Sequence, residues 1–349
     1  MAHAPMTSHM RLEIAEQPTA IAATLDAMEG VVPDIARVGA GRRHVLLFGR
    51  GSSRGAAVYG RYLIEVTAGL PVGLGEPSIG FLFRAAVDLG QTLAIFISQS
   101  GKSEELEECA LWARSHGAAT IALTNTADSS LAAACGLAVV TPTGVERAVP
   151  ATKSFTAAMV ALAFIALALA ERRPAWAAHL RDLPAAAERQ LFANIRPVVD
   201  VLGAQDLILA VGRALTLSTA QETALKIVEA AAIPSYAISA AELQHGPAAV
   251  LRPGVGVLLI GPAAGPTLNG LTAIAHTARA ASAAVTAVGG HASLAALADG
   301  WVTGPDLPEP LAPIVLTVAG QLIAAALAEQ RGQNPDVAAG LAKVTHTIQ

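Results

Sequence analysis

Residues 93–103, LAIFISQSGKS, run from a stretch of apolar side chains directly into a cluster of hydroxyls, an amide and a glycine. A short continuous apolar run bounded by Ser and Gly is typical of a buried strand in a parallel sheet. Residues 104–116 then predict a helix with Ser103 as its N-cap. Because ligands of open parallel sheets bind beyond the carboxyl ends of the strands, residues 98–103 lie where a ligand is expected.

The chain also contains an internal repeat. Four apolar stretches of the first half recur in the second half at an offset of about 162–165 residues. The pairs are 44–50 with 206–213, 93–97 with 255–260, 118–125 with 283–290, and 136–142 with 300–305. Short apolar runs that alternate with helix-period segments predict parallel α/β layers. We expect an N-terminal helix within 1–31, α/β subdomains at 32–172 and 195–332, a helical connector at 173–194 and a tail at 333–349.

The composition limits the classes of partner. Of the 349 residues, 53% are hydrophobic and 14% are charged, and the net charge is −4. No basic tract suits nucleic acid or anionic lipid, so we expect a small phosphate ligand and neither a nucleic acid nor a membrane partner. The uncharged stretches 154–170 and 311–328 are shorter than the roughly 20 apolar residues of a membrane span and predict buried helices. Two cysteines and no signal-peptide pattern predict a reduced, cytoplasmic setting.

A second cluster of hydroxyls follows another predicted strand. Residues 48–55, FGRGSSRG, come after the apolar run 44–48 and precede an expected helix at 55–67. Helix N-termini present free N–H groups and a positive dipole end, and serine hydroxyls add neutral donors. We therefore predict that one phosphate is bound by the two clusters, through Ser52, Ser53, Ser98, Gln99, Ser100 and Ser103. The alternative is that these serines only mark turns and helix caps.

Three groups in the second half suit proton transfer. Glu222, Lys226 and Glu229 follow the i, i+4, i+7 spacing of one helical stripe, although an ordinary solvated ion pair has the same spacing. His245 precedes Gly-Pro, where a helix must stop, and histidine is a common proton carrier in enzymes. Lys343 is in the tail. Isomerising a sugar phosphate requires a group that opens the ring, a carboxylate base and a cation that stabilises the developing negative charge.

These segments together resemble the SIS (sugar isomerase) family, including the isomerase half of glucosamine-6-phosphate synthase and the SIS-type glucosamine-6-phosphate deaminases. The residues that carry the resemblance are 51–53, 98–101, 146–155 (ERAVPATKSF), 222–229, 242–247 (ELQHGP) and 341–343. The resemblance implies two tandem SIS subdomains, each a flavodoxin-like parallel sheet with helices on both faces. It also implies that the protein uses no metal and no other cofactor. Ala151 and Lys102 depart from the common family pattern.

The resemblance further assigns roles to the candidate residues. Glu229 would move the proton between C1 and C2, and His245 would open the ring. Lys343 would reach the sugar carbonyl, with Lys226 and Glu222 supporting the site. In relatives the histidine comes from the neighbouring subunit, which implies a homodimer with a shared active site.

The expected reaction is deamination and isomerisation of glucosamine 6-phosphate to fructose 6-phosphate. Only about 30 residues precede the first expected subdomain, and they contain no cysteine-initiated glutaminase, which favours release of ammonia over its fixation. Three alternatives stay open. The substrate could be a galactosamine or fructosamine phosphate, the reaction could be a plain aldose–ketose isomerisation, or the protein could be a non-enzymatic sugar-phosphate sensor.

Overall fold

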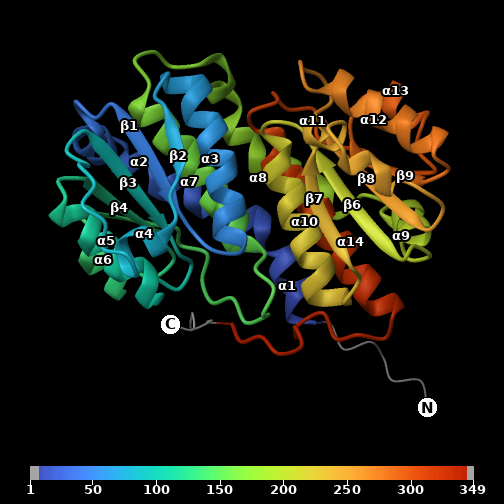
Figure 1. Ribbon diagram of the computed structural model, residues 1–349, viewed down its shortest axis with the longest axis horizontal. Helices are drawn as coiled ribbons and strands as arrows, with labels where there is room; N and C mark the ends of the chain where they lie inside the picture. Colours follow the sequence, from blue (N-terminus) through green and yellow to red (C-terminus); the bar gives the residue numbers. More distant parts are fainter. Residues whose placement is uncertain (1–7, 344–349) are drawn as a thin grey trace. The chain divides into compact units, whose positions relative to one another are not determined.

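The structure, a computed structural model, describes residues 8–343 and divides into two compact units. The first unit comprises Thr19–Val145 and Ser154–Arg181. The second unit comprises the segment that ends at Pro18, Glu146–Lys153 and Asp182–Lys343. Each unit contains one five-stranded sheet, and each is described here by itself (Figure 1).

The sheet of the first unit is parallel throughout, with the strand order β2-β1-β3-β4-β5. Its strands are β1 (His44–Phe48), β2 (Val72–Leu74), β3 (Thr92–Ile97), β4 (Ala119–Thr124) and β5 (Leu137–Val140). All six residues of β3 are buried, as expected for a central strand covered on both faces. The apolar run that begins at Leu93 is thus the middle of this sheet.

Helices connect these strands or flank them in sequence. They are α2 (Gln17–Gly39), α3 (Ser52–Ala68), α4 (Pro77–Phe81), α5 (Glu104–Ser115), α6 (Ser130–Ala134), α7 (Lys153–Leu169) and η1 (Ala175–Asp182). The helix expected at 104–116 is confirmed as α5. The helix expected at 55–67 begins earlier, because Gly51 at φ +52° turns the chain and Ser52 is already helical.

The second unit repeats the topology of the first. Its parallel sheet has the order β10-β9-β8-β6-β7, which read from the other edge is the arrangement of the first sheet. The strands are β6 (Leu207–Gly212), β7 (Ser235–Ser239), β8 (Val255–Gly261), β9 (Ala284–Gly289) and β10 (Gly300–Val302). All four repeated pairs of apolar stretches are therefore strands at equivalent places, and the predicted tandem flavodoxin-like fold is confirmed.

The helices of the second unit come from the N-terminal segment and from the chain after residue 182. They are α1 (His9–Ala15), α8 (Leu183–Leu191), α9 (Arg196–Leu202), α10 (Thr216–Ala231), α11 (Ala240–Leu243), η2 (Pro247–Val250), α12 (Leu268–Ala280), α13 (Ala292–Ala295) and α14 (Ala312–Gln330). Two helices, α1 and α2, occupy the segment where one N-terminal helix was expected. The break falls at Glu16, just before Pro18, which lacks the N–H that a continuous helix would need.

The two uncharged stretches are the core helices α7 and α14. Helix α14, drawn in red beside α10 in Figure 1, is the one helix of residues 8–343 that is long and apolar enough to cross a membrane. Within the most apolar window of α14, 89% of the residues are buried inside the protein. Such burial is typical of the core helix of a soluble domain.

Candidate active site

Helix α10 carries three of the predicted catalytic side chains on one face. The Nζ atom of Lys226 is 3.7 Å from Glu222 Oε1 and donates a hydrogen bond to Glu229 Oε2. The side chains of Lys226 and Glu222 are 1% and 0% exposed, whereas that of Glu229 is 15% exposed. The alternative of an ordinary solvated ion pair is therefore wrong for this stripe.

The surroundings of Lys226 decide its protonation. Burial lowers the pKa of Lys226, but the negative charges of Glu222, Glu229 and Glu146 outweigh this effect and leave the pKa above its usual value. The ammonium is therefore charged at neutral pH in the interior of the second unit. A buried cluster of charges costs desolvation free energy, and such clusters are frequent at functional sites.

The tail joins this cluster through Glu146. The Nζ atom of Lys343 lies 2.8 Å from Glu146 Oε2, and the Glu146 side chain is 0% exposed. The backbone N–H and the hydroxyl of Thr152 donate hydrogen bonds of 2.9 and 3.2 Å to Glu146 Oε1. Glu146 also contributes to the raised pKa of Lys226, so one carboxylate influences both lysines. Glu146 is the first residue of the 146–155 motif, but no role was predicted for it.

The segment 146–153 that carries Glu146 is held by the N-terminal helix and by α14. The backbone N–H groups of Arg147 and Ala148 donate to the carboxylate of Glu13, the second bond measuring 3.3 Å. Glu13 is 4% exposed, and burial raises the pKa of its carboxyl. Gln321 of α14 donates a hydrogen bond of 3.3 Å to the carbonyl of Thr152.

His245 is in a different environment. Helix α11 ends at Leu243, as the Gly-Pro signal predicted, and the N–H of His245 closes the turn on the carbonyl of Glu242 at 3.0 Å. The imidazole is exposed, and within residues 8–343 it has no hydrogen-bond or ion-pair partner. Its role in ring opening stays a prediction.

The first hydroxyl cluster forms an ordered loop between β3 and α5. Ser98 Oγ accepts a hydrogen bond of 3.2 Å from Gly101 N, and Ser100 Oγ accepts one of 3.3 Å from Lys102 N. The carbonyl of Gln99 accepts from Asn125 N at 3.0 Å, which ties the loop to the end of β4. Positive φ at Gly101 allows this tight turn.

Ser103 is the N-cap residue of α5 by position, as predicted, but its hydroxyl makes no capping bond. The expectation of a side-chain cap is therefore wrong. Within the described chain this hydroxyl has no hydrogen-bond partner, so it is available to a ligand.

The second hydroxyl cluster lies at the start of α3. Ser52 and Ser53 are the first residues of that helix and are half-buried. Strands β1 and β3 are neighbours, and the strand order reverses between them. This switch point is where doubly wound sheets bind ligands, so both predicted clusters flank the expected position for an anion.

An acidic residue beside the clusters is neutralised. Glu105, in the first turn of α5, is 4% exposed and is bound by two nitrogen atoms of Arg50, at 2.6 and 3.1 Å. The hydrogen bonds to Glu105 raise the pKa of Arg50. This ion pair turns the carboxylate away from solvent, which removes one source of repulsion toward a phosphate.

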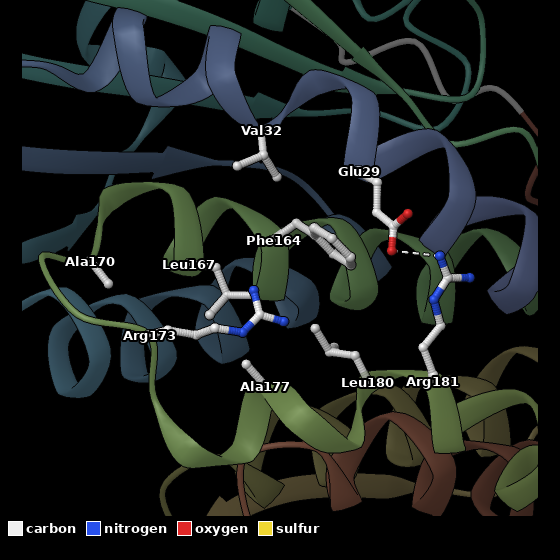
Figure 2. A pocket seen from close by; sticks show the side chains of 9 residues that line it. All are labelled: Glu29, Val32, Phe164, Leu167, Ala170, Arg173, Ala177, Leu180 and Arg181. Atoms are coloured by element: carbon white, nitrogen blue, oxygen red, sulfur yellow. Dashed lines mark hydrogen bonds and ion pairs between the residues drawn. The ribbon is translucent and has the colours of Figure 1, made fainter.

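Figure 2 shows a separate cavity of about 500 Å³ in the first unit, between α2, α7 and η1. Its walls are mostly apolar, and at one side Glu29 forms an ion pair of 2.5 Å with Arg181. None of the predicted site residues lines it. In the described part of the chain, no group of three or more His, Cys, Asp or Glu side chains is arranged to hold a metal ion.

Comparison with known proteins identifies a domain in the first half of the chain. Residues 40–168 match the family model described as SIS domain. The chain is 31% identical over 344 residues to a glutamine–fructose-6-phosphate aminotransferase [isomerizing] from Pyrococcus horikoshii, with 96% of this chain and 57% of that protein covered. The chain thus spans little more than half the length of this relative.

Two solved structures share the fold. One, described as a phosphosugar isomerase from Silicibacter pomeroyi, is 29% identical with a TM-score of 0.85, and 94% of this chain and all of that chain are covered. The other, the C-terminal domain of glucosamine-fructose-6-phosphate aminotransferase from Francisella tularensis, has a TM-score of 0.87 at 22% identity, over 97% of this chain and 99% of that one. This second likeness concerns the fold alone. Residues 40–168 therefore belong to the SIS domain family, and the second unit contains a sheet of the same topology.

Proposed function

We propose that the protein is an amino sugar phosphate deaminase and isomerase that converts glucosamine 6-phosphate and water into fructose 6-phosphate and ammonia. The observation that carries this proposal is the buried charge cluster on α10. A carboxylate that moves a proton between adjacent carbons must be held in one orientation and must still reach the substrate. The cluster offers one such group.

That group is Glu229. Of the three charged side chains of the stripe, only Glu229 has appreciable exposure, so it can meet a substrate while Lys226 and Glu222 support it from the interior. Glu229 would take the proton from C2 of the open-chain amino sugar and return it at C1. The C2 amine becomes an imine, water adds to C2, and ammonia leaves with formation of the ketone.

A cation is needed while negative charge develops on the sugar oxygen. Lys343 is 24% exposed and is fixed by Glu146, so its ammonium suits this task. For the phosphate we propose Ser52, Ser53, Ser98, Gln99, Ser100 and Ser103, because hydroxyls and helix N-termini bind anions without a cluster of basic residues. His245 would open the sugar ring, and by the family pattern it would serve the neighbouring subunit of a homodimer.

The two cysteines of this sequence favour release of ammonia over its fixation. Release of ammonia from glutamine commonly uses a thiolate, but Cys109 and Cys135 are buried, and burial raises the pKa of each thiol to about 12. Neither can act as that nucleophile. The Pyrococcus relative is named for fructose 6-phosphate and for isomerisation, which supports a six-carbon sugar phosphate as the substrate.

The experiment is an assay of ammonia release from a panel of amino sugar phosphates. We expect turnover of glucosamine 6-phosphate, and loss of it by at least about 100-fold in Glu229→Gln with ligand binding retained. Turnover of only a galactosamine or fructosamine phosphate would show that the proposed substrate is wrong and identify the actual one. Aldose–ketose conversion without release of ammonia would show that the protein is an isomerase and not a deaminase. Binding without any turnover would indicate a sensor and overturn the proposal.

A further inference from the structure

We infer that Glu146 is a positioning residue that fixes the ammonium of Lys343 for the reaction on the sugar. The inference rests on the proposed function, since it assumes that Lys343 meets the substrate. It adds a residue of the loop 146–153 to a site otherwise built from α10 and the tail.

The two carboxylate oxygens of Glu146 have different partners. Oε1 is held by the backbone N–H and the hydroxyl of Thr152, and Oε2 faces Lys343 Nζ at 2.8 Å. Because the side chain is fully buried, its orientation cannot drift with solvent. The position of the lysine nitrogen is therefore set by the loop.

The loop itself is fixed at several points. Glu13 binds the backbone N–H groups of residues 147 and 148, and Lys153 pairs with Glu16 of the same N-terminal segment. The N–H of Val149 donates to the carbonyl of Asp336 at 2.9 Å. The tail is thus tied to the loop first at Asp336 and again at Lys343.

Between these two points the tail has little support of its own. Ala338 is 3% exposed, but residues 339–342 are all exposed. Lysine has a long and flexible side chain, and a lysine at the end of an exposed segment would sample many positions without a fixed partner. The contact with Glu146 is therefore what defines the place of Lys343, and the same carboxylate charge acts on Lys226 of α10.

The first test does not depend on enzyme activity. Trypsin must bind the lysine side chain in its own pocket before it cleaves, so the lysine must first leave its ion pair. The cleavage rate after Lys343 therefore reports how firmly Glu146 binds that lysine. In Glu146→Gln, which keeps the shape of the side chain, we expect cleavage after Lys343 to be about 10-fold faster. The matched control is Glu309→Gln, a half-buried carboxylate of the second unit, which is bonded to Thr267 and should leave the rate unchanged.

The second test uses turnover. We expect kcat of Glu146→Gln to fall on the order of 10- to 100-fold with little change in KM, because the phosphate contacts are elsewhere. The double variant with Lys343→Met should be no slower than Lys343→Met alone, since Glu146 acts through that lysine. Should Glu146→Gln fail to fold, Glu146→Asp keeps the charge, withdraws it from Lys343 and should give a smaller loss of the same kind.

The outcomes separate the two proposals. Normal turnover by Glu146→Gln, or losses that multiply in the double variant, would overturn the positioning role and leave the proposed function intact. Faster cleavage after Lys343 without turnover of any sugar phosphate by the unaltered protein would establish the ion pair but remove the proposed function, and the positioning role with it.

Discussion

Replacement of Lys226 by methionine should destabilise the protein strongly. The methionine keeps an unbranched side chain in the interior and removes only the ammonium. Glu222, with a fully buried side chain, then loses the cation whose nitrogen lies 3.7 Å away, and Glu229 and Glu146 lose a shared positive neighbour. Removal of one partner from a buried ion pair costs about 3–5 kcal/mol, and we expect the free energy of unfolding to fall by this amount.

The assay is equilibrium unfolding in urea at one protein concentration and neutral pH, followed by circular dichroism. A second variant, Lys226→Met with Glu222→Gln, also neutralises the buried carboxylate on the same helix and should recover about 1–3 kcal/mol. Lys102→Met is the matched control. Lys102 is exposed near the end of the loop before α5, so its loss should change stability by no more than about 0.5 kcal/mol.

The stabilisation by Lys226 should depend on pH. The pKa of Lys226 is raised above 10.5, so the folded state binds this proton more tightly than the unfolded chain does. The stabilisation is fully present below the unfolded value and is lost as the pH rises through the folded pKa. Lys226→Met should lack this alkaline loss. A cost below about 1 kcal/mol, or a double variant no more stable than Lys226→Met, would refute the account of a buried charge cluster.

Three further predictions follow from other sites. Burial raises the pKa of Glu13, so the unaltered protein should lose stability relative to Glu13→Gln as pH rises from about 4.5, measured by urea midpoints between pH 4 and 7. A Cβ on Gly101, at φ +63°, would come within 2.2 Å of Ser129 Oγ, so Gly101→Ala should cost roughly 2–4 kcal/mol by the same assay. Cys109 and Cys135 should resist a thiol reagent at pH 8 until urea unfolds the protein, and rapid labelling of the native protein would contradict their burial.

The sheet was predictable where burial alone defines a strand. The runs 93–97 and 255–260 are apolar throughout, and each is the counterpart of the other in the repeat, which made the pattern unambiguous. The edge strands Val72–Leu74 and Ser235–Ser239 were not predicted. Only one residue of each is buried, and each is paired on one side only, so these strands depend on contact with β1 and β6 rather than on their own composition.

The burial of the charged stripe on α10 could not be predicted from its periodicity. Glu222, Lys226 and Glu229 have the same spacing whether the face is solvated or buried. The choice is made by packing, because α14 approaches α10 so closely that a Cβ on Gly320 would lie 2.1 Å from Thr223 Oγ1. Such closeness depends on a helix almost a hundred positions further along the chain, and no local pattern contains it.

Glu146 marks the limit of prediction for the site, for a physical reason. It belongs to an irregular segment with no period, so neither its burial nor its orientation follows from neighbouring residues. Its loop is set by Glu13, 134 positions before Arg147, and its charge meets Lys343, 197 positions after it. The segment 146–153 follows the last strand of the first sheet in sequence, yet by contacts it is part of the second unit. A tandem repeat predicts two similar sheets, but the charged centre requires both ends of the chain to meet this one loop, and that requirement exists only in the folded protein.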